Sequence, residues 1–342
     1  MKQYLLPKQV NYYKANLHCH STISDGNSTP EELVEAYRSH GYSVLALTDH
    51  EGCFDHTDLC REDFLLITGY EWACNDRKIT DDASRFGRKC YHFNFLAKDR
   101  HNTAHVSFDP TLAARILSDP SVIPSLNVIG EEESRVYSVD FMNDVIRRAK
   151  EAGYLVAYNH PAWSLQEPED YAGLRGLYAM EIYNHDCAQT GLFEYDAGAY
   201  DCMLRSGQRL GCIATDDAHC AYPFGHPLSD AFGGWTMIAA EKLDYGMIMD
   251  SLEKGDFYAS RGPEIRELYV ENGKVYITSS DAREISFSTA GRRAKTVRAN
   301  RGETVNAAIF ELNPTDVYFR LEVCDWEGMR ANSRAYFLDE LK

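Results

Sequence analysis

The sequence predicts an α/β protein in which a barrel of β/α units is followed by a small antiparallel β module. Over the first two thirds, short apolar runs alternate with helical patterns, as is typical of a parallel sheet covered by helices. About seven such units fit a closed or nearly closed barrel better than an open sheet. After Gly262-Pro263, short alternating runs are separated by turn signals such as Asn272-Gly273, which indicate hairpins. We therefore expect two domains, 1–263 and 264–342.

The expected elements of the first domain follow from local signals. Thr29-Pro30-Glu31-Glu32 is typical of a helix start, because Thr caps, Pro suits the first turn and acids face the positive end of the helix dipole. This helix should end near Gly41, and further helices are expected over 138–152 and 192–205. Strands are expected over 12–18, 43–47, 64–67, 91–97, 155–158, 178–183 and 210–214. The polar segments 75–89 and 221–230, and the stretch 102–133, should form loops over one end of the barrel.

Composition narrows the class of protein. The chain has 342 residues, 44% of them hydrophobic, and a formal net charge of -17, which fits a soluble globular protein. An acidic surface disfavours a long nucleic acid as partner. The ten cysteines include no C-x-x-C pair, and the chain has neither an apolar leader pattern nor a 20-residue apolar run, so we expect free thiols, no membrane partner and a cytoplasmic location.

Seven short clusters place His, Asp, Glu or Asn at or just past an apolar run. They are 16–20 with 24–26, 47–50, 68–72, 91–93, 158–161, 180–184 and 214–219. Parallel strands of a barrel end on one face, so these side chains should converge there. His18 and His20 are two residues apart and should point the same way, because side chains alternate along a strand. Imidazole and carboxylate groups together suit zinc, manganese or iron.

The ordered motifs resemble those of the PHP superfamily, named for polymerase and histidinol phosphatase, over residues 12–263. The resemblance is carried by His18-Cys19-His20, Ser24-Asp25-Gly26, Thr48-Asp49-His50, Gly69-Tyr70-Glu71, His92, Asn159-His160-Pro161 and Asp217-Ala218-His219. It implies a distorted (β/α)7 barrel with two or three divalent metal ions at its carboxyl-terminal face. The C-terminal module resembles, more weakly, the extension of the carbaryl-hydrolase-like group within this superfamily.

The resemblance also implies a role for each motif residue. His18, His20 and Asp217 would hold one metal; Asp25, His50 and His219 would hold a second. Glu71 would bridge, and His92 and His160 would share it at a third metal. Asp216 competes with Asp217, but only Asp217 has the D-x-H spacing. Asp49 and Asn159 are candidates for orienting the ligand histidines, although Asp49 could equally cap a helix.

A phosphate-bearing substrate would favour cations beyond the metals. Arg261 is the preferred candidate, and we group it with Glu71 and Asp217 as a catalytic residue. Arg135, Arg85, Arg88 and Lys89 are weaker candidates. His185 could serve as a general acid, although a loop histidine at the rim is the simpler interpretation. No nucleophilic side chain is required, so Cys19 needs no role.

We therefore expect a metal-dependent phosphoesterase that acts on a small phosphorylated molecule, such as a nucleotide or short oligonucleotide, through a water that bridges metals. Two alternatives stay open. The same cluster could hydrolyse a carbonyl ester, carbamate or amide, or the chain could be a non-catalytic metal-binding or regulatory module. For the β module, covering a barrel edge is preferred over binding a partner or sugar. Oligomeric state has no readable signal.

Overall fold

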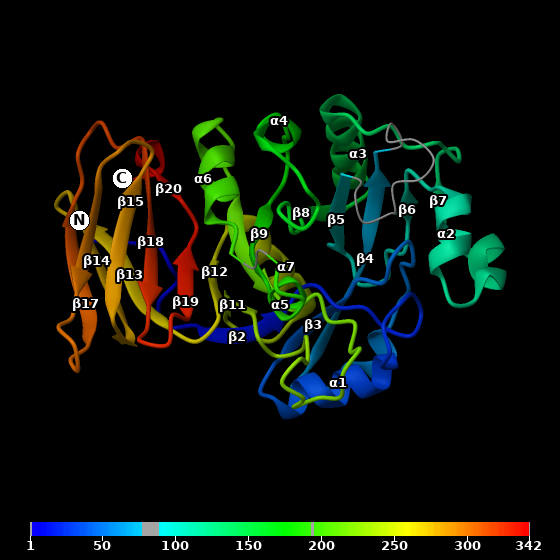
Figure 1. Cartoon of the computed structure of the whole chain (residues 1–342), viewed down its shortest axis with the longest axis horizontal. Coiled ribbons are helices and arrows are strands. Elements are labelled where there is room, and N and C mark those ends of the chain that lie inside the picture. Colours follow the sequence, from blue (N-terminus) through cyan, green and yellow to red (C-terminus); the bar gives the residue numbers. More distant parts are fainter. Residues whose placement is uncertain (1, 77–88, 193–194, 342) are drawn as a thin grey trace.

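The computed structural model describes residues 2–76, 89–192 and 195–341 (Figure 1). The strands are β1 Gln3–Tyr4, β2 Asn11–Asn16, β3 Val44–Leu47, β4 Leu65–Asn75, β5 Cys90–Ala97, β6 His105–Val106, β7 Val128–Ile129, β8 Tyr154–Tyr158, β9 Ala179–Asn184, β10 Gly211–Thr215, β11 Trp235–Ala240, β12 Phe257–Ser260, β13 Ile265–Glu271, β14 Lys274–Ala282, β15 Glu284–Thr289, β16 Ala294–Arg298, β17 Val305–Glu311, β18 Tyr318–Cys324, β19 Arg330–Ser333 and β20 Tyr336–Phe337. The α-helices are α1 Pro30–Ser39, α2 Pro110–Ile116, α3 Val139–Glu151, α4 Pro168–Tyr171, α5 His185–Gln189, α6 Ala197–Arg205 and α7 Tyr245–Lys254, with short 3-10 helices at Thr57–Leu59, Pro120–Ser125 and Leu338–Glu340.

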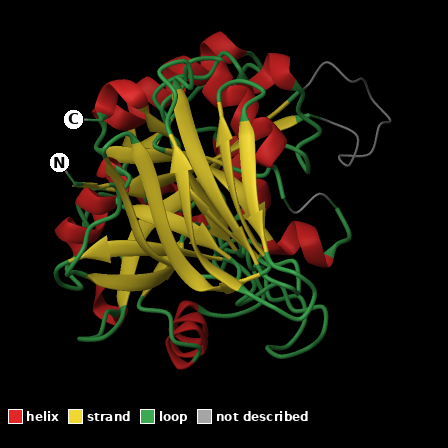
Figure 2. Ribbon diagram, turned by 90° about the vertical axis from the view of Figure 1, so that its left-hand side faces the viewer, coloured by secondary structure: helices red, strands yellow, loops and turns green. Residues whose placement is uncertain are grey.

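The α/β class is confirmed, but the sheet is mixed rather than parallel. Strands run through the middle of the molecule with helices around the outside (Figure 2). The order of the large sheet is β10-β9-β8-β5-β4-β3-β2-β11-β12-β19-β18-β15-β16, with β20 beside β18. β2, β3 and β4 are parallel, and so are β8, β9 and β10. β5 is antiparallel to both β4 and β8.

The described strands form no closed ring of backbone pairs, so the barrel stays a prediction. β10 stands at one end of the sheet order, and a side chain connects it to β11. The backbone N–H of Ala214 donates to Thr236 Oγ1 at 3.3 Å, and the Thr236 hydroxyl donates back to the Ala214 carbonyl at 3.1 Å. These hydrogen bonds hold β10, at one end of the large sheet, against β11 in its other half. Side chains from the two halves can therefore face one another.

The helix caps follow the sequence signals closely, and one helix boundary was wrong. Thr29 and Glu32 form a capping box at the start of α1, and Ser138 caps α3. The helix expected over 192–205 begins only at Ala197, and a separate short helix, α5, precedes it. The apolar positions of α3 pack into the main core with strand residues such as Tyr158 and Met180.

The C-terminal β module continues the large sheet instead of standing apart from it. β19 pairs with β12, so the ladder passes directly into the module. A second sheet, β1-β13-β14-β17, packs on this extension over an apolar core that includes Leu268, Ile277, Phe287 and Leu321. The first strand of the chain, β1, belongs to that second sheet, which the boundary at residue 263 did not foresee. Both chain ends therefore lie at the module (Figure 1).

Within the described parts of the chain, none of the helices combines the length and the apolar character that a membrane crossing requires.

A buried ion pair joins helix α6 to the module, and its loss should be costly. Arg320 Nε and Nη2 donate to the two carboxylate oxygens of Asp201 at 2.7 and 3.0 Å, and the Arg320 side chain is only 7% exposed. Asp201→Ala leaves this guanidinium buried without its partner, so we expect the free energy of unfolding to fall by about 2 kcal/mol. Urea denaturation measures the change. Asp250→Ala, which removes an exposed partner of Lys254, should cost less than about 0.5 kcal/mol and serves as control.

Candidate metal centre

The nine histidine and carboxylate residues expected as ligands lie together; most follow the carboxyl ends of strands, whereas Glu71 lies within β4 and His92 near the amino end of the antiparallel β5. Their ligand atoms form overlapping groups in which every member lies within 4.8 Å of the others. The groups are His18, His20 and Asp217; His20, Asp25, His50 and His219; His18, Glu71 and His160; and His50, Glu71 and His92. The structure therefore brings together all nine residues, although their roles as ligands remain a prediction.

Glu71, on β4, stands at the centre of the cluster. Its Oε1 lies 3.0 Å from His92 Nδ1 and 3.4 Å from His160 Nε2, while its Oε2 lies 3.0 Å from His50 Nδ1. His18 Nε2 approaches Oε1 at 3.3 Å. His20 Nε2 lies 3.5 Å from Oε2, so five imidazoles share this carboxylate, which matches the bridging position that the resemblance implied.

His18 and His20 converge on Asp217 from the segment that follows β2. Their Nε2 atoms lie 3.2 Å apart, and each lies about 3 Å from Asp217 Oδ1, at 3.0 and 3.1 Å. In the described part of the chain, Asp217 Oδ1 and His20 Nδ1 are buried without a hydrogen bond. Buried polar atoms without partners are costly, so this set of nitrogen and oxygen donors fits divalent metal ions well.

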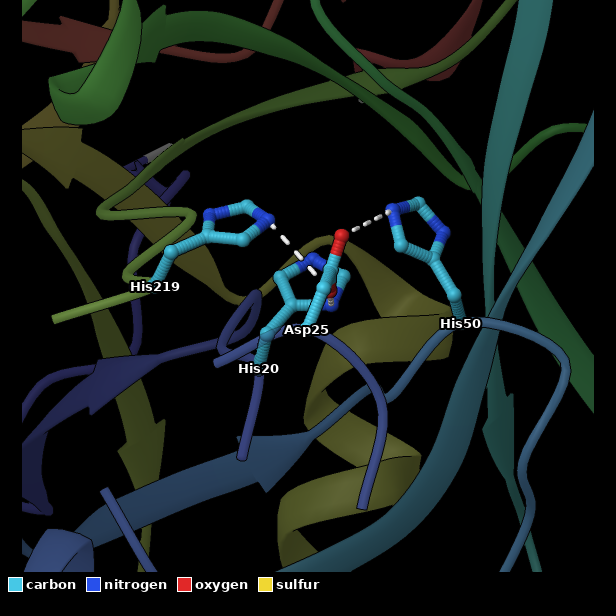
Figure 3. Close-up of side chains that lie close together, drawn as sticks. All are labelled: His20, Asp25, His50 and His219. Carbon is cyan, nitrogen blue, oxygen red and sulfur yellow. Dashed lines mark ion pairs between the residues drawn. The ribbon is translucent and has the colours of Figure 1, made fainter. Parts of the chain in front are cut away.

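The second expected set surrounds Asp25 (Figure 3). Asp25 Oδ1 lies 3.6 Å from both His20 Nδ1 and His219 Nε2, and its Oδ2 lies 3.8 Å from His50 Nε2. The Asp25 side chain is 38% exposed and that of His219 is 25% exposed, whereas His18 and His20 are fully buried. The cluster consequently opens to solvent on the side of Asp25 and His219.

The third expected set is only partly reproduced. His92 and His160 both contact Glu71 Oε1, but their ligand atoms form no group of three with it among the described residues. His160 groups with His18, and His92 groups with His50. The geometry thus supports the first two sets more strongly than the third.

Backbone conformation at the strand ends aims the ligands inward. Asp217 has φ of 54° and His160 has φ of 23°, both in the left-handed region that non-glycine residues rarely adopt. Gly26 closes the turn before the first helix, where an added Cβ would lie 2.3 Å from the His20 carbonyl oxygen. This close approach explains why glycine follows Asp25.

The charges of the cluster move the pKa values of its members in opposite directions. Burial lowers the pKa of His20 to about 4, assisted by the nearby His219 and His50, so its imidazole is neutral at pH 7. Burial alone would lower the pKa of His18, but Asp217, Glu71 and Glu181 raise it well above 6.5. Burial opposes ionisation of Glu71, yet His92, His18 and His50 hold its pKa well below the usual value. The carboxylates are therefore ionised, as metal ligands must be.

Glu181 contacts two of the expected ligands, although the sequence analysis assigned it no role. Its cluster was noticed, but no role was assigned to it because Glu181 lies inside β9 and not past its end. Its Oε1 lies 2.7 Å from His18 Nδ1, and its Oε2 accepts the His160 backbone N–H at 3.0 Å. This contact directs His18 Nε2 toward the cluster, as carboxylates commonly do for metal-binding histidines.

The two expected orienting residues act on other partners. The side-chain amide of Asn159 donates to Glu71 Oε1 at 2.7 Å, while its backbone N–H donates to the His92 carbonyl at 3.1 Å. Asp49 is not a helix cap; it accepts hydrogen bonds from Ser21 and Ser24 and so fixes the turn that carries Asp25. Asp216 points away from the cluster, because Tyr37 and the backbone N–H groups of residues 232–234 donate to its carboxylate.

The candidate cations separate into three cases. Arg261 stacks on Tyr183, with its Cζ 3.9 Å from the ring centroid, next to the end of β9. Arg135 is wrong as a phosphate-binding residue, because it is buried in an ion pair with Glu51 and also donates to the carbonyls of Ala73 and Ser107. Lys89 pairs with Asp170 at 2.7 Å, and Arg85 and Arg88 lie outside the described residues.

His185 is unsuited to general acid catalysis. Its Nδ1 lies 2.7 Å from the Tyr183 hydroxyl, at the rim near Arg261. Burial and, secondarily, the charge of Arg261 lower the pKa of His185 to about 4. The ring is therefore neutral at pH 7 and holds no spare proton, which agrees with the simpler interpretation as a rim histidine.

Comparisons with known proteins match part of the chain. The model of the PHP domain family matches residues 16–107. A 5'-3' exoribonuclease of Haemophilus influenzae is 42% identical over 66 residues, which cover 18% of this chain and 24% of that protein. An error-prone DNA polymerase of Mycobacterium bovis is 57% identical over 42 residues, 12% of this chain and 4% of the polymerase. The chain thus spans a quarter or less of the length of these relatives.

Among solved structures, a two-domain protein of Bacteroides vulgatus that contains a predicted PHP-like metal-dependent phosphoesterase is similar over 98% of both chains, with 17% identity and a TM-score of 0.47. An amidohydrolase from Chromobacterium violaceum is 16% identical over 60% of this chain and 87% of that chain, with a TM-score of 0.34.

Removing the Glu181 carboxylate should weaken metal binding. Glu181→Gln keeps the shape of the side chain but removes the charge that orients His18, so we expect metal affinity to fall by about 10- to 100-fold. Titration with Zn²⁺, followed by elemental analysis of the washed protein, measures the loss. Glu311→Gln, on the exposed edge of β17, is the matched control. Equal affinities in the two variants would contradict the assigned role.

Proposed function

We propose that this protein is a metal-dependent phosphoesterase that hydrolyses a small phosphorylated molecule. The observation that supports this most is the convergence of nine donor residues, with the buried carboxylate of Glu71 at their centre. Divalent ions held by such a set activate water and stabilise negative charge on phosphoryl oxygens. The match of residues 16–107 to the PHP domain adds support, because that segment carries six of the nine donor residues: His18, His20, Asp25, His50, Glu71 and His92.

The chain's own residues account for the remaining tasks in this proposal. His18, His20 and Asp217 would hold one metal, and Asp25, His50 and His219 a second, with Glu71 between them. His92 and His160 would complete a third position beside Glu71. Zn, Mn and Fe all suit these donors. A substrate would reach the centre from the side on which the Asp25 and His219 side chains are exposed.

A nucleotide or short oligonucleotide is the substrate class that we favour. The relatives matched over short segments are an exoribonuclease and a DNA polymerase. The Trp163 ring is 38% exposed, and its centroid lies 4.9 Å from that of His160 and 5.6 Å from that of His92. An exposed aromatic face beside the centre could stack on a base. The acidic chain disfavours a long nucleic acid, since tracking a phosphate backbone needs a basic groove.

The proposal retains the finer expectations from the sequence. They are a distorted (β/α)7 barrel, a carbaryl-hydrolase-like C-terminal extension that covers its edge, and a cytoplasmic location. Arg261 is proposed to bind the substrate phosphate. Its place on Tyr183, next to the strand that carries Glu181, sets it at the rim, and its Nε is buried without a hydrogen-bond partner in the described part of the chain.

Metal removal should abolish phosphate-ester hydrolysis. After treatment with a chelator, we expect no release of p-nitrophenol from p-nitrophenyl phosphate, and adding Mn²⁺ or Zn²⁺ should restore it.

The His20→Ala variant should lose activity by at least about a hundredfold, since the substitution removes a donor common to two groups. His226→Ala, in the exposed loop after the centre, is the matched control. Full activity without bound metal would refute the proposal.

Arg261 distinguishes phosphorus from carbonyl chemistry. Arg261→Ala removes one charged hydrogen bond to the phosphate, so kcat/KM for p-nitrophenyl phosphate should fall about 10- to 100-fold. Turnover of p-nitrophenyl acetate, which lacks that charge, should change little. Arg266→Ala removes an exposed arginine of β13 and serves as control. Turnover of the acetate alone by the wild-type enzyme would favour a carbonyl hydrolase, and no turnover of either would favour a binding module.

A further inference from the structure

A second polar cavity lies at the opposite end of the strands from the metal centre. Its volume is about 370 Å³, and it is bounded by the amino ends of three parallel strands, at Tyr154 of β8, Tyr178 before β9 and Gly211 of β10. The ligand residues His160 and Asp217 follow the carboxyl ends of β8 and β10. The length of the strands therefore separates the cavity from the centre, and a ligand there would touch none of the nine donor residues.

Positive side chains reach this cavity from separate elements. Lys150 comes from the last turn of α3, Lys254 from the last turn of α7, Arg209 from the loop before β10, and Arg334 from the segment between β19 and β20. A neighbouring cavity of about 270 Å³ shares Lys150 and Arg209 and adds Arg175. This concentration of cations contrasts with a chain whose formal net charge is -17.

The two carboxylates that line the cavity already have partners. Glu340 accepts from Arg209 and Arg334, each at 3.2 Å. Glu253 accepts from Lys98 at 2.7 Å. Lys150 makes no ion pair within the described ranges of the chain. Arg209 also pairs with Asp339 at 2.6 Å and Lys254 with Asp250 at 3.5 Å, so Lys150 supplies the positive charge that remains available to a ligand in the cavity.

Two buried polar atoms in the lining residues also lack partners. Tyr178 Oη and Arg334 Nε have no hydrogen bond to any described residue. Each is a donor, and leaving a buried donor unpaired is unfavourable.

The dipoles of helices α3 and α7 account for only some of the positive side chains that line the cavity. Lys150 and Lys254 lie in the last turns of α3 and α7, where cations complement the negative end of the helix dipole. Arg209 and Arg334 are not in helices, and the dipoles give no reason for the two unpaired donors. The apolar walls formed by Leu155, Leu177 and Phe337 offer contact to the carbon skeleton of a ligand.

We propose that this cavity binds a small organic molecule that carries a dianionic phosphate group. Lys150 and Arg334 contact the phosphate, and the apolar walls hold the organic part. The site is separate from the metal centre and does not depend on the activity proposed above.

Isothermal titration of the metal-loaded, full-length protein with phenylphosphonate tests this site. Phenylphosphonate cannot be hydrolysed as an ester and combines a dianionic head with an apolar ring. Four proteins form a cycle: wild type, Lys150→Ala with Arg334→Met, His20→Ala, and all three substitutions together. We expect the Lys150 and Arg334 substitutions to lower affinity at least tenfold, and to do so equally with and without His20.

Further variants and melting temperatures test whether a change in phenylphosphonate affinity comes from a general loss of charge or from misfolding. Lys150→Ala alone changes an exposed side chain and should still lower affinity measurably, while Lys274→Ala, on an exposed pair of β14, should not. Melting temperatures identify any variant that fails to fold. Binding that is unchanged by the Lys150 and Arg334 substitutions, or that disappears only with His20→Ala, would overturn the proposal.

Discussion

The contact of one carboxylate with five imidazoles organises this end of the molecule. Glu71 is buried in the middle of β4, and each of its oxygens faces histidines from other segments. Four positively polarised rings keep this carboxylate ionised despite its burial. An ionised group at this depth is stable only when charges surround it, so the strands around β4 must end where their histidines can reach it.

A layer of hydrogen bonds outside the donors keeps them in place. Glu181 fixes His18, Asn159 fixes Glu71, and Asn184 donates to Asp217 Oδ2 at 3.0 Å. The buried pair of Arg135 and Glu51 acts in the same way on the backbone, since Glu51 follows His50 and its N–H donates to the Glu71 carbonyl at 3.0 Å. Arg135, which the sequence analysis considered as a phosphate-binding residue, therefore supports the metal centre instead.

The sequence was most informative where one strand end carries one polar motif. His18, His50, Glu71, His160 and Asp217 each follow or end a short apolar run, and these residues do meet. The strand directions were less accessible, because apolar runs such as residues 91–97 look the same whether a strand runs parallel or antiparallel to its neighbours. Glu181 was overlooked for a related reason: inside a buried strand, an isolated acid has no sequence signal that reveals its partner. The joining of β1 to β13 depends on contacts between residues more than 260 positions apart, which no local pattern records.

The pairing of β1 with β13 and of β2 with β11 has a consequence for how the chain assembles during synthesis. β1 cannot pair until β13 has been synthesised, and one edge of β2 stays unpaired until β11 has been synthesised. His18 likewise meets Asp217 only after some two hundred further residues have been made. Closing such long loops makes folding slow. The donor residues of the early strands thus stay apart until about two thirds of the chain, up to His219, has been made.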